Sequence, residues 1–263
     1  MSTEVRRPKV GLFVTCLVDL MRPSVGFAAA RLIEAAGCDV EVPIGQTCCG
    51  QPAYNSGDRA TAAELARRTV AVLEGYDYVV VPSGSCGGML KAHYPRLLAD
   101  DPAWAKRAAA LSQKVHELVS FLVDVRGMTA VDATFVGRVT YHDSCSGLRE
   151  LGVKAQPRRL LTSVKGLELV EMADCETCCG FGGTFSVKYP DISNSIVEKK
   201  TANAAAVAPD LLLAGDLGCL MNMAGKIART HAESGGGGRS PVAVRHVAEV
   251  LAGELSEPPI AGD

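Results

Sequence analysis

Three features are missing from the 263-residue sequence, and each absence excludes a class of protein. No apolar run can span a membrane, because the most apolar region, 204–215, is broken by Pro209 and Asp210 and falls short of roughly 20 residues. No stretch is dense in Lys or Arg and the net charge is only -2, so nothing indicates binding to nucleic acid or to an anionic membrane. No secretory signal is visible, since the apolar stretch 10–14 is too short and no small-residue cleavage site follows it. We therefore expect a cytoplasmic protein.

Cysteine, in contrast, is plentiful, with ten residues in the chain. Disulfides are rare in the reducing cytosol, so this many thiols point to metal or redox chemistry. The chain is long enough for one large domain or for two domains of about 130 residues.

Eight of the cysteines form an internal repeat. The first half has a single cysteine, a Cys-Cys-Gly triplet and another single cysteine, and the second half has the same series. The matched pairs are Cys16 and Cys145, Cys48 and Cys178, Cys49 and Cys179, and Cys86 and Cys219, at offsets of 129, 130, 130 and 133 residues. His116 and His246 extend the match at an offset of 130. The repeat predicts two domains, 1–130 and 131–263, with the boundary within 126–137.

Short apolar runs alternate with helical patterns in both halves. We expect strands at 10–14, 39–42, 78–81, 138–141, 167–171 and 211–213, and helices at 25–36, 59–73, 158–163 and 192–206. This alternation predicts an α/β fold of two pseudo-repeated domains, each a small, mainly parallel sheet flanked by helices. The eight cysteines follow strands, so they are expected at the carboxyl ends of the strands, where such sheets bind ligands.

Four thiolates satisfy either a [4Fe-4S] cluster or a tetrahedral zinc ion. Structural zinc sites usually take their ligands from Cys-x-x-Cys turns, whereas adjacent cysteines point in different directions and suit a cluster with several irons. The spacing therefore favours iron–sulfur over zinc, on the number and softness of the ligands. Gly50 and Gly180 would let the backbone pass close to the metal.

The remaining cysteines and the histidines have other interpretations. Cys38 has no partner in the repeat and is read as a packed, buried residue. Cys175 forms Cys-x-x-Cys with Cys178, which leaves open a role as a ligand or as a redox thiol. His142, near Cys145, could tune or protonate the site or be hydrogen-bonded only. His116 and His246 could act near the site or serve in capping and packing.

Several segments together resemble the CCG-type cysteine-rich family, over nearly the whole chain. They are VTCLVD, QTCCGQPAYNSGD, PSGSCGGM, YHDSCSGLRELGVK, TCCGFGGTFSVK and GDLGCLMN. The family includes the cysteine-rich subunit of heterodisulfide reductase and iron–sulfur subunits of lactate utilization, to which these segments are most similar. The resemblance implies that the eight repeated cysteines are the metal ligands, holding one or two clusters of the [4Fe-4S] type, with zinc in one half in some members. Met89 and Asn222 stand where the heterodisulfide reductase branch has a fifth cysteine in each half, which argues against heterodisulfide cleavage.

The resemblance further implies an iron–sulfur oxidoreductase subunit that relays electrons in the oxidation of L-lactate to pyruvate. Its partners would be the other lactate-utilization subunits, proteins B and C of that system. No residue is evidently placed to take a hydride or a proton from lactate. Two alternatives stay open: a zinc-stapled, non-catalytic assembly subunit, and a thiol–disulfide reductase that uses Cys175 and Cys178.

Overall fold

The chain folds into two parallel β-sheets, one from each half of the sequence. The structure is a computed structural model that describes residues 6–235 and 241–261. The first sheet has the strand order β2 (Asp39–Glu41), β1 (Lys9–Leu12), β3 (Tyr78–Val81), β4 (Val115–Glu117). The second has the order β6 (Lys165–Leu169), β5 (Thr134–His142), β7 (Leu211–Ala214), β8 (Ala243–His246). All pairings within both sheets are parallel.

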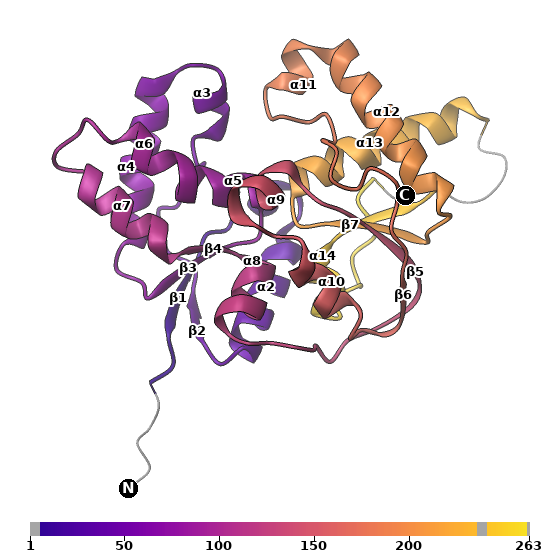
Figure 1. Cartoon of the computed structure of the whole chain (residues 1–263), viewed down its shortest axis with the longest axis horizontal. Coiled ribbons are helices and arrows are strands. Elements are labelled where there is room, and N and C mark those ends of the chain that lie inside the picture. Colours follow the sequence, from indigo (N-terminus) through magenta and orange to yellow (C-terminus); the bar gives the residue numbers. More distant parts are fainter. Residues whose placement is uncertain (1–5, 236–240, 262–263) are drawn as a thin grey trace, which may run out of the picture.

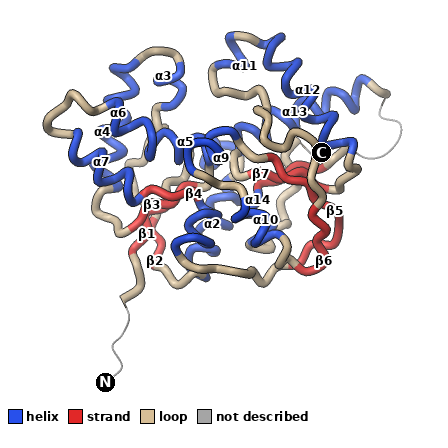
Figure 2. Tube along the Cα trace, in the orientation of Figure 1, coloured by secondary structure: helices blue, strands red, loops and turns tan. Residues whose placement is uncertain are grey.

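Helices connect the strands and cover the sheets (Figure 2). The first half contains α1 (Cys16–Met21), α2 (Pro23–Ala35), α3 (Gln51–Asn55), α4 (Arg59–Leu73), α5 (Gly84–Gly88), α6 (Tyr94–Leu97), α7 (Ala105–Lys114) and α8 (Leu118–Ser120), with π-helical turns at Met89–His93 and Phe121–Val125. The second half contains α9 (Cys145–Leu151), α10 (Ala155–Leu161), α11 (Phe185–Lys188), α12 (Pro190–Ala206), α13 (Leu217–Glu233) and α14 (Val247–Leu251). Among the described residues, no helix has the length and apolarity needed to cross a membrane.

The predicted α/β fold of two repeated units is confirmed, and one strand per sheet adds to it. The expected strands and helices are present with ends shifted by a few residues. The outer strands β4 and β8 were not predicted, because their sequences, VHE and AVRH, are only three and four residues long and show neither an apolar run nor a regular alternation of polar and apolar residues. Their register places His116 beside Val80 and His246 beside Ala214.

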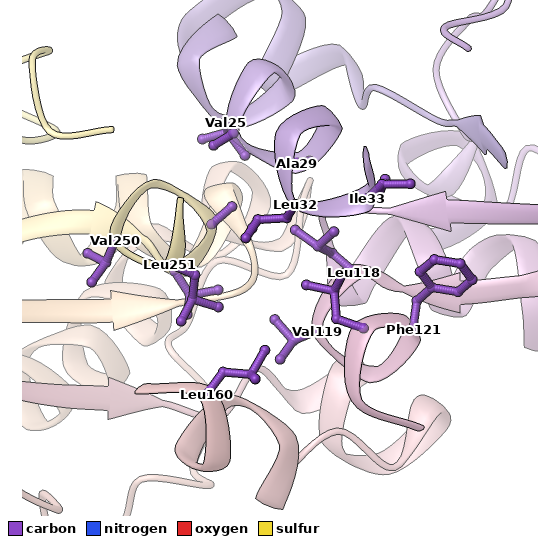
Figure 3. Close-up of a cluster of buried hydrophobic side chains, with 14 of the residues drawn as sticks. Val25, Ala29, Leu32, Ile33, Leu118, Val119, Phe121, Leu160, Val250 and Leu251 are labelled. Carbon is purple, nitrogen blue, oxygen red and sulfur yellow. The ribbon is translucent and has the colours of Figure 1, made fainter. Parts of the chain in front are cut away.

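One hydrophobic cluster joins the two halves. Leu32 and Ile33 of α2 and Leu118 of α8 lie in the same buried cluster as Leu160 of α10 and Leu251 of α14 (Figure 3). Burying apolar side chains from both halves in one cluster removes their surface from water only while the halves stay together. Helix α2 also packs directly on α14.

A second, closer contact lies where α5 crosses α9, in the middle of the molecule (Figure 1). A Cβ atom at Gly84 would come within 2.6 Å of Ser144 Oγ and 2.8 Å of the Gly147 nitrogen. Only glycine permits this approach of the two backbones. The contact fixes the position of two cysteine-bearing helices relative to each other, since α5 contains Cys86 and α9 begins at Cys145.

Candidate metal centres

The first cysteine set converges beside the carboxyl ends of β1 and β3. Thr15 accepts a hydrogen bond from Val18 N and so starts α1 at Cys16, directly after β1. Ser83 accepts a hydrogen bond from Cys86 N and starts α5 after β3. Between them, the loop after β2 brings in Cys48 and Cys49, and the sulfurs of Cys49 and Cys86 lie 3.4 Å apart.

The second set is arranged in the same way. Cys145 begins α9 after β5, and Asp216 caps α13 after β7 so that Cys219 lies in its first turn. The thiol of Cys178 interacts with those of Cys145 and Cys179, and Cys179 interacts with Cys219. The structure thus brings together the four predicted residues of each half. All ten cysteines of the chain are free of disulfide bonds.

Each Cys-Cys-Gly triplet turns through a left-handed glycine. Gly50 has φ of 84° and Gly180 has φ of 85°, a backbone conformation that other residues adopt only with strain. As a result, the N–H of Gly50 points at Cys48 Sγ (3.4 Å) and that of Gly180 at Cys178 Sγ (3.3 Å). These bonds stabilise negative charge on the sulfur and, at an iron–sulfur cluster, would tune its potential.

The thiols within each set perturb one another strongly. The pKa of Cys48 is lowered, chiefly because the thiol of Cys16 donates a hydrogen bond to its sulfur, and the pKa of Cys16 is raised by the same contact. Cys178 and Cys145 repeat this pattern in the second half. Each set therefore favours one thiolate that shares its neighbours' protons, and a bound cation would take the place of those protons.

A hydrogen-bonded bridge joins the two sets. The carboxylate of Asp216 accepts hydrogen bonds from Ser83 Oγ (3.0 Å) and Ser85 N (2.8 Å) of the first half, and from Cys219 N (3.4 Å) of its own helix. Gly84 N donates to Gly215 O across the same boundary (3.2 Å). The residues that cap α5 and α13 thus connect the helices of Cys86 and Cys219 directly. Nothing in the sequence alone paired Ser83 with Asp216, although each lies three residues before its cysteine.

Met89 and Asn222, which stand where the heterodisulfide reductase branch has a fifth cysteine, have different surroundings from each other. Asn222 Nδ2 donates to the carbonyl of Cys179 (2.9 Å), and in the first half Tyr94 donates its hydroxyl to the carbonyl of Cys49 (2.8 Å). Met89 is fully buried in the apolar cluster beside the first set. Asn222 and Tyr94 thus hold the triplets in place, and Met89 contributes apolar packing beside the first set.

Cys38, Cys175 and His246 lie outside the two cysteine sets, each in different surroundings. Cys38 is buried in the core shared by the halves, in agreement with its interpretation as a packed residue. Cys175 is partly buried with its sulfur 3.9 Å from Arg158 Nη2, and that guanidinium forms an ion pair with the buried Asp143. His246 Nδ1 accepts a hydrogen bond from Ala248 N and caps α14.

His142 and His116 differ in what surrounds their rings. His142 is fully buried with ligand atoms of Cys179 and Cys219, and all three atoms lie within 4.8 Å of one another. Burial lowers the pKa of His142 to about 3, so its ring is neutral at ordinary pH. His116 packs instead against the rings of Tyr78 and Phe121.

The model of the cysteine-rich domain family CCG matches residues 10–91 and 139–224, two segments that contain the two cysteine sets. Lactate utilization protein A of Geobacillus kaustophilus is 49% identical over 92% of this chain and 98% of its own length. The protein of the same name from Oceanobacillus iheyensis is 45% identical over 92% of this chain and 96% of its own length.

Among solved structures, a hypothetical protein from Helicobacter pylori is similar with a TM-score of 0.62 at 11% identity. The similarity covers 96% of this chain and 50% of that one, so this chain spans about half the length of that protein. At this level of identity the likeness shows the fold alone.

Proposed function

The chain belongs to the cysteine-rich domain family CCG, and from this premise we propose that it is an iron–sulfur subunit that relays electrons in the oxidation of L-lactate to pyruvate. The relatives named lactate utilization protein A support the process. The observation that supports the chemistry is the presence of two convergent sets of four thiols, connected by the Asp216 bridge.

The donor set fits iron–sulfur clusters. All four repeated donors in each half are sulfurs, which suit iron–sulfur clusters and zinc rather than hard cations. A bound cluster of this kind would accept and release single electrons. The protein's own contribution would be to supply Cys16, Cys48, Cys49 and Cys86 in the first half and Cys145, Cys178, Cys179 and Cys219 in the second. The N–H groups of Gly50 and Gly180 would stabilise the charge on sulfur.

The surroundings of the first set favour a relay over a substrate site. A cavity of about 320 Å³ opens beside Cys16 and Cys48. Its polar lining includes Asp19 and Gln46, and none of the residues that line it is a Lys, an Arg or a His. Carboxylate substrates are usually held by cationic side chains, and the Asp19 carboxylate would repel one. We therefore assign lactate oxidation itself to partner subunits, proteins B and C of the lactate-utilization system.

The contacts of Cys178 do not favour the thiol–disulfide alternative. Its sulfur interacts with Cys145 and Cys179 within the set, whereas Cys175 is near Asp143 and Arg158. A redox pair of Cys175 and Cys178 would have to break this arrangement.

The proposal is tested by following cluster reduction with electron paramagnetic resonance after adding L-lactate. The wild-type chain should be reduced when the two partner subunits are present and should stay oxidised without them. Cys86→Ser should lose the signal of the first centre, and Cys38→Ser, the matched control, should behave as wild type. Oxidation of lactate by the isolated chain, or no reduction in the full complex, would contradict the relay.

A further inference from the structure

The two cysteine sets differ in the residue at the end of the strand that precedes them. Three residues before Cys145 stands His142, and three residues before Cys16 stands Phe13. Both side chains are almost completely buried, at 0% and 1% exposure. Phe13 packs in the apolar cluster that includes Cys49 and borders Cys48 and Cys86. The repeat has therefore placed an apolar ring beside one set and an imidazole beside the other.

The imidazole of His142 lacks hydrogen-bond partners in the protein. Neither Nδ1 nor Nε2 makes a hydrogen bond with the described residues, although both are inaccessible to solvent. Buried polar atoms are nearly always paired, so an unpaired imidazole needs a further partner. The nearest backbone acceptor is the carbonyl of Cys175, which already accepts hydrogen bonds from Asp143 N (3.1 Å) and Lys200 Nζ (2.9 Å) and so offers the ring only a weak third contact.

The geometry places this ring among the sulfurs. One nitrogen of His142 and the sulfurs of Cys179 and Cys219 lie within 4.8 Å of one another. Ligands at the corners of a tetrahedron around zinc are about 3.8 Å apart, given a Zn–S distance of about 2.3 Å. A small contraction would bring the three atoms onto one ion.

We propose that His142 is a nitrogen ligand of the metal centre in the second half, which makes that centre a mixed thiolate–imidazole site while the first centre is bound by thiolates alone. This inference rests on the proposed function only in treating the second cysteine set as a metal centre. It makes the halves chemically different, because the second set then offers five donors, an imidazole and four thiolates, whereas the first offers four thiolates. Neutral imidazole suits zinc as well as iron, and an iron held by imidazole in place of a thiolate has a higher reduction potential. An electron passing between the halves would then meet two unequal centres.

The test uses the full-length chain freed of metal and loaded with zinc alone, measured by X-ray absorption at the zinc edge. The wild-type spectrum should contain the scattering pattern of an imidazole ring. His142→Phe installs the residue that the first half uses at this position and should remove that pattern. It should also weaken zinc binding at one centre by about 10- to 100-fold or more, as loss of a partner of the metal site does. His116→Gln removes an imidazole remote from both sets and should leave the spectrum unchanged.

Phe13→His provides an independent check should His142→Phe not fold. It adds an imidazole at the equivalent position of the first set and should increase the imidazole scattering. A wild-type spectrum with sulfur scattering alone overturns the inference, as does an unchanged pattern in His142→Phe, a lack of gain in Phe13→His, or a second half that binds no zinc. The outcome does not depend on iron. A chain that holds no cluster would contradict the proposed electron relay, whereas imidazole scattering at zinc would still support His142 as a ligand.

Discussion

The two Cys-Cys-Gly triplets allow one substitution to be compared at two matched sites. Gly50 and Gly180 have φ values of 84° and 85°, and each donates its N–H to the sulfur two residues earlier. Replacing either by alanine forces a Cβ into the left-handed region, at a cost of about 1–2 kcal/mol. Reduced freedom of the unfolded chain offsets this by less than about 1 kcal/mol. These contributions are the same at both positions.

The space around the new Cβ is different. At Gly50 the nearest atoms, Ala62 O and Leu65 Cβ, lie at 3.4 Å, an ordinary contact. At Gly180 the Cβ would lie 2.7 Å from the carbonyl oxygen of Ser193 in helix α12, and backbone atoms of a helix cannot move aside easily. Overpacking of this kind costs about 1–3 kcal/mol. Gly180→Ala should therefore destabilise the protein by about 1–3 kcal/mol more than Gly50→Ala.

Thermal unfolding followed by circular dichroism measures this difference. For a chain of this size, 1 kcal/mol corresponds to about 2–4 °C, so the melting temperature of Gly180→Ala should be roughly 2–12 °C below that of Gly50→Ala. Metal content is determined on the same samples, because loss of metal would lower both temperatures. Equal melting temperatures, or a lower one for Gly50→Ala, would refute the assignment of the close contact at Gly180.

Four further substitutions probe the buried carboxyl group of Glu117, the Asp216 bridge and the role of Cys175. Burial raises the pKa of Glu117 from 4.5 in the unfolded chain to about 7 in the folded protein. The folded state therefore holds this proton more tightly, and the free energy of unfolding should fall by about 3 kcal/mol as the pH rises from about 4.5 to 7. Glu117→Gln should remove this fall when unfolding is measured at pH 5 and pH 8, and an unchanged pH dependence would be evidence against it. Asp216→Asn leaves only one acceptor oxygen for the N–H and O–H groups that cap α5 and α13, and should cost about 1–3 kcal/mol in denaturant unfolding; wild-type stability would show that the bridge is not formed. Cys175→Ser should retain the metal of the second half, whereas Cys178→Ser should lose it. Elemental analysis of the two variants shows which of the two cysteines is a metal ligand. Metal loss in both variants would make Cys175 part of the centre.

The fold could be predicted because the repeat and the strand pattern are local signals. Apolar runs such as 78–81 identify strands covered on both faces, and the constant offset of the cysteines identifies two copies of one unit. The short outer strands were missed, since β4 and β8 contain charged residues and His116 and His246 obscure the alternation.

The contacts between the halves could not be predicted from the sequence. Ser83 and Asp216 are 133 residues apart, and Gly84 meets Gly147 only because α5 and α9 cross. Such pairs depend on how the two sheets are oriented, which no local pattern encodes. The unpaired imidazole of His142 could not be predicted either, because only the structure shows that the carbonyl of Cys175 accepts its hydrogen bonds from other groups.

The central claim is that the cysteine sets hold one or two iron–sulfur clusters. It is tested most directly by iron and acid-labile sulfide analysis of the full-length protein purified without oxygen, together with its visible spectrum before and after reduction. The account predicts iron and sulfide in equal amounts and a broad absorbance that bleaches on reduction. Zinc alone, with neither sulfide nor a visible chromophore, would contradict it and would leave a zinc-stapled assembly subunit.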